Sequence, residues 1–171
     1  METNRHYDQL LGLDKDWSVT DVKLDITGRR LDIYVSYVGT MATCPSCDTL
    51  CSLYDHAPER SWRHLDTMQF LTTIHAGIPR IACGEHKVRT INVPWAGKHS
   101  RFTLLFEAFA IKVPEGSRSI SDACKILRPG WQQTQSIMRS AVERGLAKRD
   151  AEEIPWIGID EKSFKKGRHY I

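Results

Sequence analysis

The chain has 171 residues, of which 41% are hydrophobic, and its net charge is +3. This hydrophobic content is enough to bury the cores of one to three small domains and excludes a disordered chain. The apolar runs fall short of the roughly eighteen residues of a membrane span, and the first residues lack the basic-then-apolar pattern of a secretory signal. We therefore expect a cytoplasmic protein, whose five cysteines serve metal binding or burial rather than disulfides.

Positive charge is concentrated in the middle of the chain. Residues 1–97 carry ten Lys/Arg against twelve Asp/Glu, residues 98–149 carry ten against four, and residues 150–171 carry four against five. The middle segment thus has a net charge of +6, which favours a surface that faces phosphates. A solvated basic face without a partner has the same composition.

The first segment is predicted to be β-structure. Hydrophobic residues alternate along residues 22–35 on both sides of the Gly28 turn, which is the pattern of a two-strand hairpin. A second pair of strands is predicted within residues 68–83, with turn residues at Gly77 and Pro79.

Helical periodicity begins at Ser100. A first helical stripe is formed by Phe102, Leu105, Phe106 and Phe109, and the sequence PEG at 114–116 should end that helix. Ser119 stands three residues before Asp122, as in a capping box, and opens a second helix. The sequence RPG at 128–130 separates it from a third helix that starts at Trp131, which is the plan of a helix-turn-helix.

The chain closes on a predicted strand, a Lys-Lys-Gly turn and a returning strand within residues 154–171, with Asp160 inside the first strand. The predicted fold class is therefore α+β, in three parts. Residues 1–97 form a β-rich module, residues 98–149 form a helix-turn-helix domain, and residues 150–171 begin a further β domain.

Two pairs of metal-ligating residues have matched spacing. CPSC supplies Cys44 and Cys47, and CGEH supplies Cys83 and His86. Two intervening residues let one turn present two ligands to a tetrahedral zinc ion, and four protein ligands are what a structural zinc site requires. The 35 residues between the two pairs leave room for a β-hairpin, as in a zinc ribbon.

Other residues leave the ligand set open. Cys51, four residues after Cys47, and His64 in SWRHLD are alternative fourth ligands. A further alternative is that one of the two pairs is accidental and its thiols are merely buried. Cys124 lies on an apolar helical stripe and is assigned to the helical core.

The third helix carries a polar face suited to DNA. A projection at about 100° per residue places Trp131, Thr134, Met138, Ala141, Val142 and Gly145 on the packed side and the following residues on the other: Gln132, Gln133, Ser136, Arg139, Ser140 and Arg144. Gln can bond adenine and Arg can bond guanine bidentately, whereas Ser and Arg also bind phosphates. The predicted DNA contacts are these six polar residues together with Trp131 at the start of the helix. An ordinary surface helix has a similar composition, but the local charge and the upstream metal motif favour nucleic-acid binding.

Several stretches together resemble bacterial insertion-sequence transposases of the ISL-three type. These stretches are CPSC, SWRHLD, CGEHKVRTINVPWAGKHSRFT, AVERGLAKRD and IGIDEKSFKKGRHY, and they cover nearly the whole chain. The resemblance implies a zinc module with Cys44, Cys47, Cys83 and His86 as ligands, then a helix-turn-helix whose recognition helix begins at Trp131. A ribonuclease-H-like nuclease with three catalytic carboxylates would follow.

The same resemblance implies that Asp160 is the first carboxylate of the catalytic triad. In the family the other two acids lie beyond residue 171. Glu161 points to the opposite face of a strand from Asp160 and cannot readily share its metal. Mg²⁺ is therefore expected only with the complete catalytic domain, and we expect residues 1–171 alone not to cut DNA.

The leading hypothesis is DNA binding by the N-terminal portion of a transposase that recognises the terminal inverted repeats of its element, in association with the nucleoid. A transcription regulator derived from a transposase is the alternative. A zinc-dependent hydrolase would require an open metal position. A zinc module that mediates protein contacts is a further hypothesis, and a homodimer is expected by resemblance because two DNA ends must meet.

Overall fold

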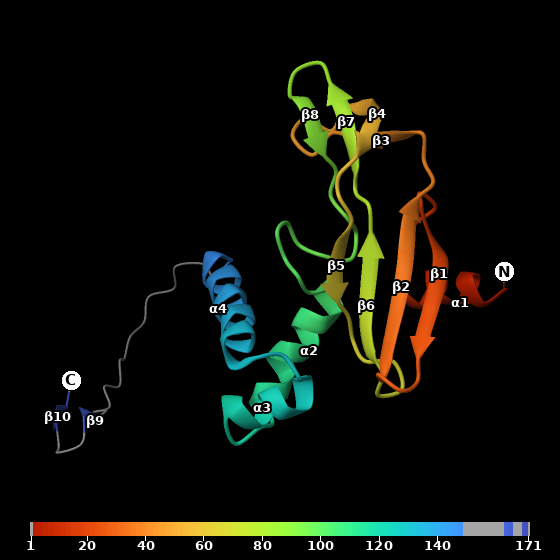
Figure 1. The fold of residues 1–171 in the computed structure, drawn as a ribbon. Coiled ribbons are helices and arrows are strands. Elements are labelled where there is room, and N and C mark those ends of the chain that lie inside the picture. The colour runs from red at the N-terminus through yellow and green to blue at the C-terminus, as the bar shows by residue number, and fades with distance from the viewer. Residues whose placement is uncertain (1, 149–162, 166–168, 171) are drawn as a thin grey trace. The chain divides into compact units, whose positions relative to one another are not determined.

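The computed structural model describes residues 2–148, 163–165 and 169–170 (Figure 1). The helices are α1 (Glu2–Leu10), α2 (Leu104–Glu115), α3 (Ile120–Leu127) and α4 (Trp131–Ala147). The strands are β1 (Trp17–Asp25), β2 (Arg30–Tyr37), β3 (Met41–Thr43), β4 (Leu50–His56), β5 (Arg60–Arg63), β6 (Leu71–Ala76), β7 (Pro79–Cys83), β8 (Lys87–Thr90), β9 (Ser163–Lys165) and β10 (His169–Tyr170). The structure is of the α+β class, as predicted.

The chain alternates between two four-stranded sheets, two strands at a time. One sheet has the order β1-β2-β6-β5, in which β2 and β6 run parallel, and the other has the antiparallel order β3-β4-β7-β8 (Figure 1). We call the second sheet the ribbon sheet. The sequence prediction of a strand pair within residues 68–83 was wrong in its pairing, because β6 pairs with β2 and β5, whereas β7 pairs with β4 and β8.

The predicted first hairpin is confirmed by the pairing of β1 with β2. Leu31, Ile33 and Val35 are buried as expected, but Leu24 is exposed. Leu24 pairs with Leu31 and therefore lies on the same face of the sheet, but it stands near the end of the edge strand β1, so burial at this position does not follow from the hydrophobic alternation.

Helix α1 was not predicted from the sequence, and it packs beside β1. Asp8 of this helix accepts a hydrogen bond from the backbone N–H of Val19 (2.6 Å), at the point where the register of β1 shifts. Tyr7 and Leu11 are partly buried against the core. The irregularity of the edge strand is therefore stabilised by a side chain from the preceding helix.

Three tryptophans form the centre of the larger core. The Trp95 ring lies edge-on to Trp17 (4.8 Å between centroids) and to Trp62 (5.6 Å), and Ile33 and Ile74 are buried in the same cluster. Because Trp95 lies in the segment between β8 and α2, this packing fixes the segment that leads from the sheets into the helices.

A second, smaller core joins the helices, and its members are Phe106, Ala110, Ala123, Leu127 and Ile137. The predicted stripe on the first helix was wrong in two of its members, since Leu105 and Phe109 are 52% and 45% exposed. The helix also begins later than predicted, after Thr103, and continues through Pro114 to end at Gly116.

Strands β9 and β10 pair antiparallel near the end of the chain. Their pairing agrees with the predicted return of the chain, but most of the predicted first strand lies outside the described residues, and its assignment to a ribonuclease-H-like domain stays a prediction. Asp160 lies outside the described residues, so its predicted role stays a prediction too. None of the helices in the described part of the chain is long and apolar enough to span a membrane.

Candidate metal centre and nucleic-acid interface

Two similar turns at one end of the ribbon sheet carry the candidate metal ligands. Cys44 and Cys47 flank the turn between β3 and β4, and Cys83 and His86 flank the turn between β7 and β8. The Cys44 backbone closes its turn by accepting a hydrogen bond from the Asp48 N–H (2.9 Å). The residue after each second ligand has a left-handed backbone, with φ of 56° at Asp48 and 59° at Lys87. The two turns therefore present their ligand pairs in the same way.

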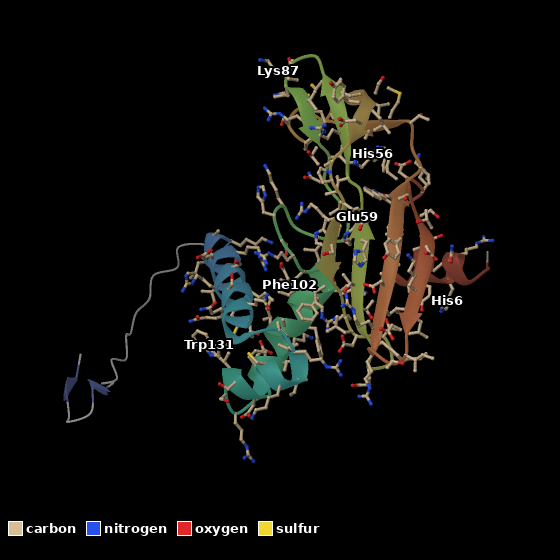
Figure 2. All side chains as sticks on the ribbon, in the orientation of Figure 1. His6, His56, Glu59, Lys87, Phe102 and Trp131 are labelled. Carbon is tan, nitrogen blue, oxygen red and sulfur yellow. The ribbon has the colours of Figure 1, made fainter. Side chains whose placement is uncertain are left out.

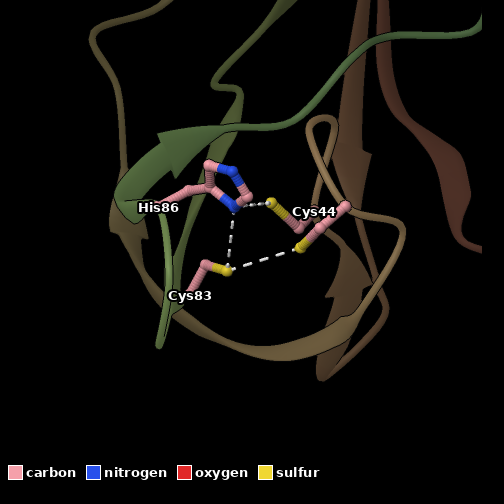
Figure 3. Close-up of side chains that lie close together, drawn as sticks. Cys44, Cys83 and His86 are labelled. Atoms are coloured by element: carbon pink, nitrogen blue, oxygen red, sulfur yellow. Dashed lines mark hydrogen bonds between the residues drawn. The ribbon is translucent and has the colours of Figure 1, made fainter.

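The four ligand atoms have separations that fit a tetrahedral zinc ion. The Sγ atom of Cys83 is 3.7 Å from Sγ of Cys47 and 3.7 Å from Nδ1 of His86, and Nδ1 of His86 is 3.9 Å from Sγ of Cys44 (Figure 3). All four lie within 4.8 Å of one another. Zn–S bonds of about 2.3 Å and Zn–N bonds of about 2.0 Å place tetrahedral ligands about 3.5 to 3.8 Å apart. The predicted quartet is thus brought together by the fold.

Hydrogen-bond donors around the sulfurs favour their thiolate form. The backbone N–H groups of His86 and Glu85 lower the pKa of the Cys83 thiol to about 7. The Thr49 hydroxyl and backbone N–H lower the pKa of Cys47. Since zinc binds the thiolate, these donors prepare two of the three cysteines for a metal ion.

The cysteines that were alternative or core candidates lie elsewhere. Cys51 is buried outside the group of four and donates a hydrogen bond to the Thr49 carbonyl (3.4 Å). Burial raises the pKa of the Cys51 thiol, and the proximity of Cys83 adds to this effect, so the protonated form is favoured. Cys124 lies between α3 and α4, where its Sγ donates to Oγ1 of the buried Thr134 (3.3 Å).

His64 also lies outside the metal group and contacts the start of the helical region instead. Its Nδ1 is 2.9 Å from Oγ1 of Thr103, the residue that caps α2 by accepting a hydrogen bond from the Phe106 N–H (3.2 Å). Burial lowers the pKa of His64 to about 4, and the Arg63 cation adds to the shift. The imidazole is therefore neutral near pH 7, and its Nδ1 can accept the Thr103 hydroxyl proton while that hydroxyl accepts from Phe106.

This environment predicts a pH dependence of stability. In the unfolded chain His64 has a pKa of about 6.5, so between about pH 6.5 and about pH 4 it binds a proton that the folded chain does not bind. The free energy of unfolding should therefore fall over this range as the pH decreases, by about 3 kcal/mol in total. Urea unfolding of the parent and of His64→Gln, at about pH 7.5 and about pH 5, should show the smaller pH effect in the variant. Equal pH effects in the two proteins would contradict this assignment.

The two helices of the helix-turn-helix begin where the sequence predicts, after Ser119 and at Trp131. Ser119 is the N-cap of α3, as predicted, because its hydroxyl accepts from the Asp122 N–H (3.2 Å); the same hydroxyl donates to the Asp122 carboxylate (3.1 Å). Arg128 ends α3 in a left-handed conformation with φ of 68°. Helix α4 begins at Trp131, so three residues separate the two helices, as predicted.

Helix α4 exposes the predicted polar face. Thr134 and Ile137 are its buried residues. The projected packed side was wrong for Trp131, Val142 and Gly145, which are exposed, and it left out Ile137. The predicted DNA contacts Trp131, Gln132, Gln133, Ser136, Arg139 and Arg144 are exposed, and Ser140 is half-buried. Gln133 has a second task, because its Oε1 accepts a hydrogen bond from the Gly130 N–H (3.1 Å) and thereby caps the helix.

A set of charged residues that the sequence analysis did not single out joins the helices to the sheet. Asp66 pairs with Arg63 at the end of β5 and, 3.4 Å away, with Arg128 at the end of α3. The Arg63 guanidinium also lies over the Phe106 ring (5.1 Å). These contacts, together with the contact between His64 and Thr103, explain why the SWRHLD stretch packs against the helical region. The charged and aromatic residues of SWRHLD are visible in the sequence, but the sequence does not indicate which residues they contact.

Comparison with family models identifies both regions. Residues 41–86 match the zinc finger of transposases IS204/IS1001/IS1096/IS1165, and residues 91–142 match the helix-turn-helix domain of transposase family ISL3. No curated protein and no solved structure matches the chain significantly. The two models follow one another in the order of the structural regions and together span more than half of the chain. The chain therefore belongs to the ISL3 family of transposases, with the zinc-binding and helix-turn-helix DNA-binding domains of its N-terminal region.

Proposed function

We propose that this chain recognises the terminal inverted repeats of an insertion sequence for DNA transposition, with α4 as the recognition helix. The observation that carries the proposal is the polar surface at the start of α4. Gln132, Gln133 and Ser136 are exposed there, while Thr134 and Ile137 hold the opposite side in the helical core. In a helix-turn-helix, this N-terminal part of the second helix reaches the edges of the bases.

The exposed side chains of α4 are suited to different contacts with DNA. Gln132 can bond an adenine bidentately. Gln133 uses its oxygen for the Gly130 N–H, so it presents amide N–H donors to a base acceptor. Arg139, Ser140 and Arg144 follow later in the helix and are suited to phosphates. Trp131, which is 48% exposed at the first position of the helix, supplies an apolar contact beside them.

The zinc centre has a structural part in this proposal. Cys44, Cys47, Cys83 and His86 provide four protein ligands, so a tetrahedral ion bound to them has no position left for water. This donor set argues against a zinc-dependent hydrolase. It supports a structural role, in which the ion holds together the two turns of the ribbon sheet that carry its ligands.

Asp160 is the residue to which we assign a catalytic role in the complete transposase. We propose this residue as the first Mg²⁺ ligand of the nuclease domain, where carboxylate-held ions would assist phosphoryl transfer. A single carboxylate holds Mg²⁺ weakly. Residues 1–171 alone are therefore expected to bind element ends without cleaving them. Incubation of a radiolabelled end fragment with these residues and Mg²⁺ should give no shorter DNA products.

Selection of duplexes from a random pool, followed by binding measurements, tests the proposal. The selected sequence should match the inverted repeats that flank the gene, whereas an operator unrelated to any element end would favour the transcription-regulator alternative. Gln132→Ala should weaken binding to the selected duplex by roughly 10- to 100-fold and relax base preference at one position. A matched control is Gln9→Ala, because Gln9 is also exposed but lies on α1.

Equal affinities of the parent and of Gln132→Ala for the selected duplex would contradict the assignment of α4 as the reading helix.

The homodimer expected by resemblance is a separate proposal. Light scattering of the chain with and without the selected duplex measures it directly.

A further inference from the structure

The segment that follows the last zinc ligand is strongly basic. Residues 87–101 contain four Lys/Arg and no Asp/Glu, although they lie mostly in the part of the chain whose overall charge is negative. The four cations are Lys87, Arg89, Lys98 and Arg101, and all are exposed. The first two lie on β8, and the last two lie in the loop that leads to α2.

None of these four cations has an acidic partner in the described part of the chain. Among the residues that the structure describes, no carboxylate lies within 4.0 Å of any of the four, whereas Arg63, Arg80 and Arg128 form ion pairs. The neighbouring Arg60 of β5 is exposed as well, and its guanidinium donates to the Ser100 carbonyl (3.1 Å) rather than to a carboxylate. We call these five residues, Arg60, Lys87, Arg89, Lys98 and Arg101, the basic surface.

The backbone beneath the basic surface is fixed on both sides of the loop. Ile91 donates to the Pro79 carbonyl (3.1 Å), the buried Trp95 accepts from the Leu104 N–H (2.8 Å), and Arg101 accepts from the Arg63 N–H (2.9 Å). In Figure 1 the chain runs from β8 through this loop into α2 along one side of the sheets, opposite to α1 and β1. Lys87 lies at the tip of the ribbon sheet in Figure 2. The cations thus belong to one continuous, ordered segment between the metal centre and the helices.

The need to protect a sheet edge from pairing with other chains explains only two of these four exposed cations. Strand β8 pairs with β7 alone in its sheet, and lysine on such an edge prevents pairing with other chains. That argument does not apply to Lys98 and Arg101, which lie in a loop. A polyanion is the partner that accounts for both groups.

We propose that the basic surface binds the phosphates of the same duplex that α4 reads, so that the zinc domain contacts DNA rather than only protein. The inference rests on the proposed function and adds a second contact region to it. Phosphate contacts position a protein on the duplex without reading its sequence. The negative net charge of residues 1–97 does not argue against it, because the acidic residues of that part of the chain lie outside residues 87–101.

Fluorescence anisotropy with a labelled mixed-sequence duplex of roughly 40 base pairs tests the inference over about 50 to about 200 mM salt. The test variant combines four substitutions: Lys87→Gln, Arg89→Gln, Lys98→Gln and Arg101→Gln. The matched control removes the same charge from the region of β1 and β2: Lys15→Gln, Lys23→Gln, Arg29→Gln and Arg30→Gln. Zinc content and thermal unfolding of both variants establish that they are folded.

The test variant should bind about 10- to 100-fold more weakly at the lowest salt. Its plot of log affinity against log salt should be shallower by about 0.9 for each phosphate that the variant no longer neutralises. The control should stay close to the parent in affinity and slope. Hydroxyl-radical footprints on the duplex selected for α4 should shorten on one side in the test variant only.

Two results would overturn the inference while leaving the proposed function intact. One is a test variant that binds like the parent, and the other is an equal loss in both variants, which would show an effect of net charge alone. Failure of the parent to bind any duplex at low salt would instead remove the proposed function, and the inference with it.

Discussion

Replacing Cys83 with serine is expected to abolish zinc binding and to unfold the ribbon sheet. The Cys83 sulfur lies 3.7 Å from Sγ of Cys47, on the other turn, and 3.7 Å from Nδ1 of His86, on its own turn. Zinc should fall from about one ion per chain to close to none, because binding of structural zinc is coupled to folding. Metal analysis and hydrogen exchange should show the loss of zinc and of amide protection in β3, β4, β7 and β8.

The matched control is Cys51→Ala. Cys51 is also a buried cysteine of the ribbon sheet, but its thiol contacts a backbone carbonyl and lies outside the group of four. This variant should keep its zinc and its amide protection. Loss of zinc from Cys51→Ala, or retention in Cys83→Ser, would mean that the ligand set is wrong.

Truncation of Trp62 should be the most destabilising change in the larger core. Its side chain is 1% exposed, lies edge-on to Trp95 and has the Arg60 guanidinium 5.0 Å from its ring. Trp62→Ala should lower the free energy of unfolding by about 3 to 5 kcal/mol, because it removes a large buried side chain and leaves a cavity. Urea unfolding followed by circular dichroism measures this change.

Trp62→Phe separates the effect of packing from that of the indole N–H. Within the described residues no acceptor meets Nε1 of Trp62, so phenylalanine loses volume but no hydrogen bond. Its cost should be about 1 to 2 kcal/mol. A cost as large as that of alanine would show that the indole N–H has a partner, such as a buried water. Because the Trp95 carbonyl accepts the first N–H of α2, Trp62→Ala should also reduce amide protection at the start of that helix.

The metal ligands could be predicted from the sequence because their chemistry is local. Each pair, Cys44 with Cys47 and Cys83 with His86, lies within one turn, and the spacing alone lets both members face the same ion. The helix-turn-helix was predictable for a similar reason. Helix caps such as Ser119 and breaks such as residues 128–130 act on neighbouring residues.

The pairing of strands was not predictable in this way. Strands β6 and β7 follow each other across a short turn, which usually indicates a hairpin. They belong instead to different sheets, because the parallel pairing of β2 with β6 and the pairing of β4 with β7 join segments far apart in the sequence. Burial of Leu105 and Phe109 was predicted wrongly because a helical stripe shows amphipathic periodicity but not which part of it will have a packing partner.

The sequence by itself predicted the four candidate zinc ligands, with Cys51 and His64 as alternatives, the two helices of the helix-turn-helix, and the resemblance to the ISL3 family. Only the tertiary structure decided the roles of the remaining polar residues. Cys51 lies close to the candidate ligands yet is a buried thiol, His64 contacts Thr103, the residue that caps α2, and Asp66 pairs with two arginines from different regions. The physical reason is the range of the interactions: turns, caps and ligand pairs depend on residues a few positions apart, whereas burial and ion pairing depend on contacts that exist only after the sheets and helices have packed.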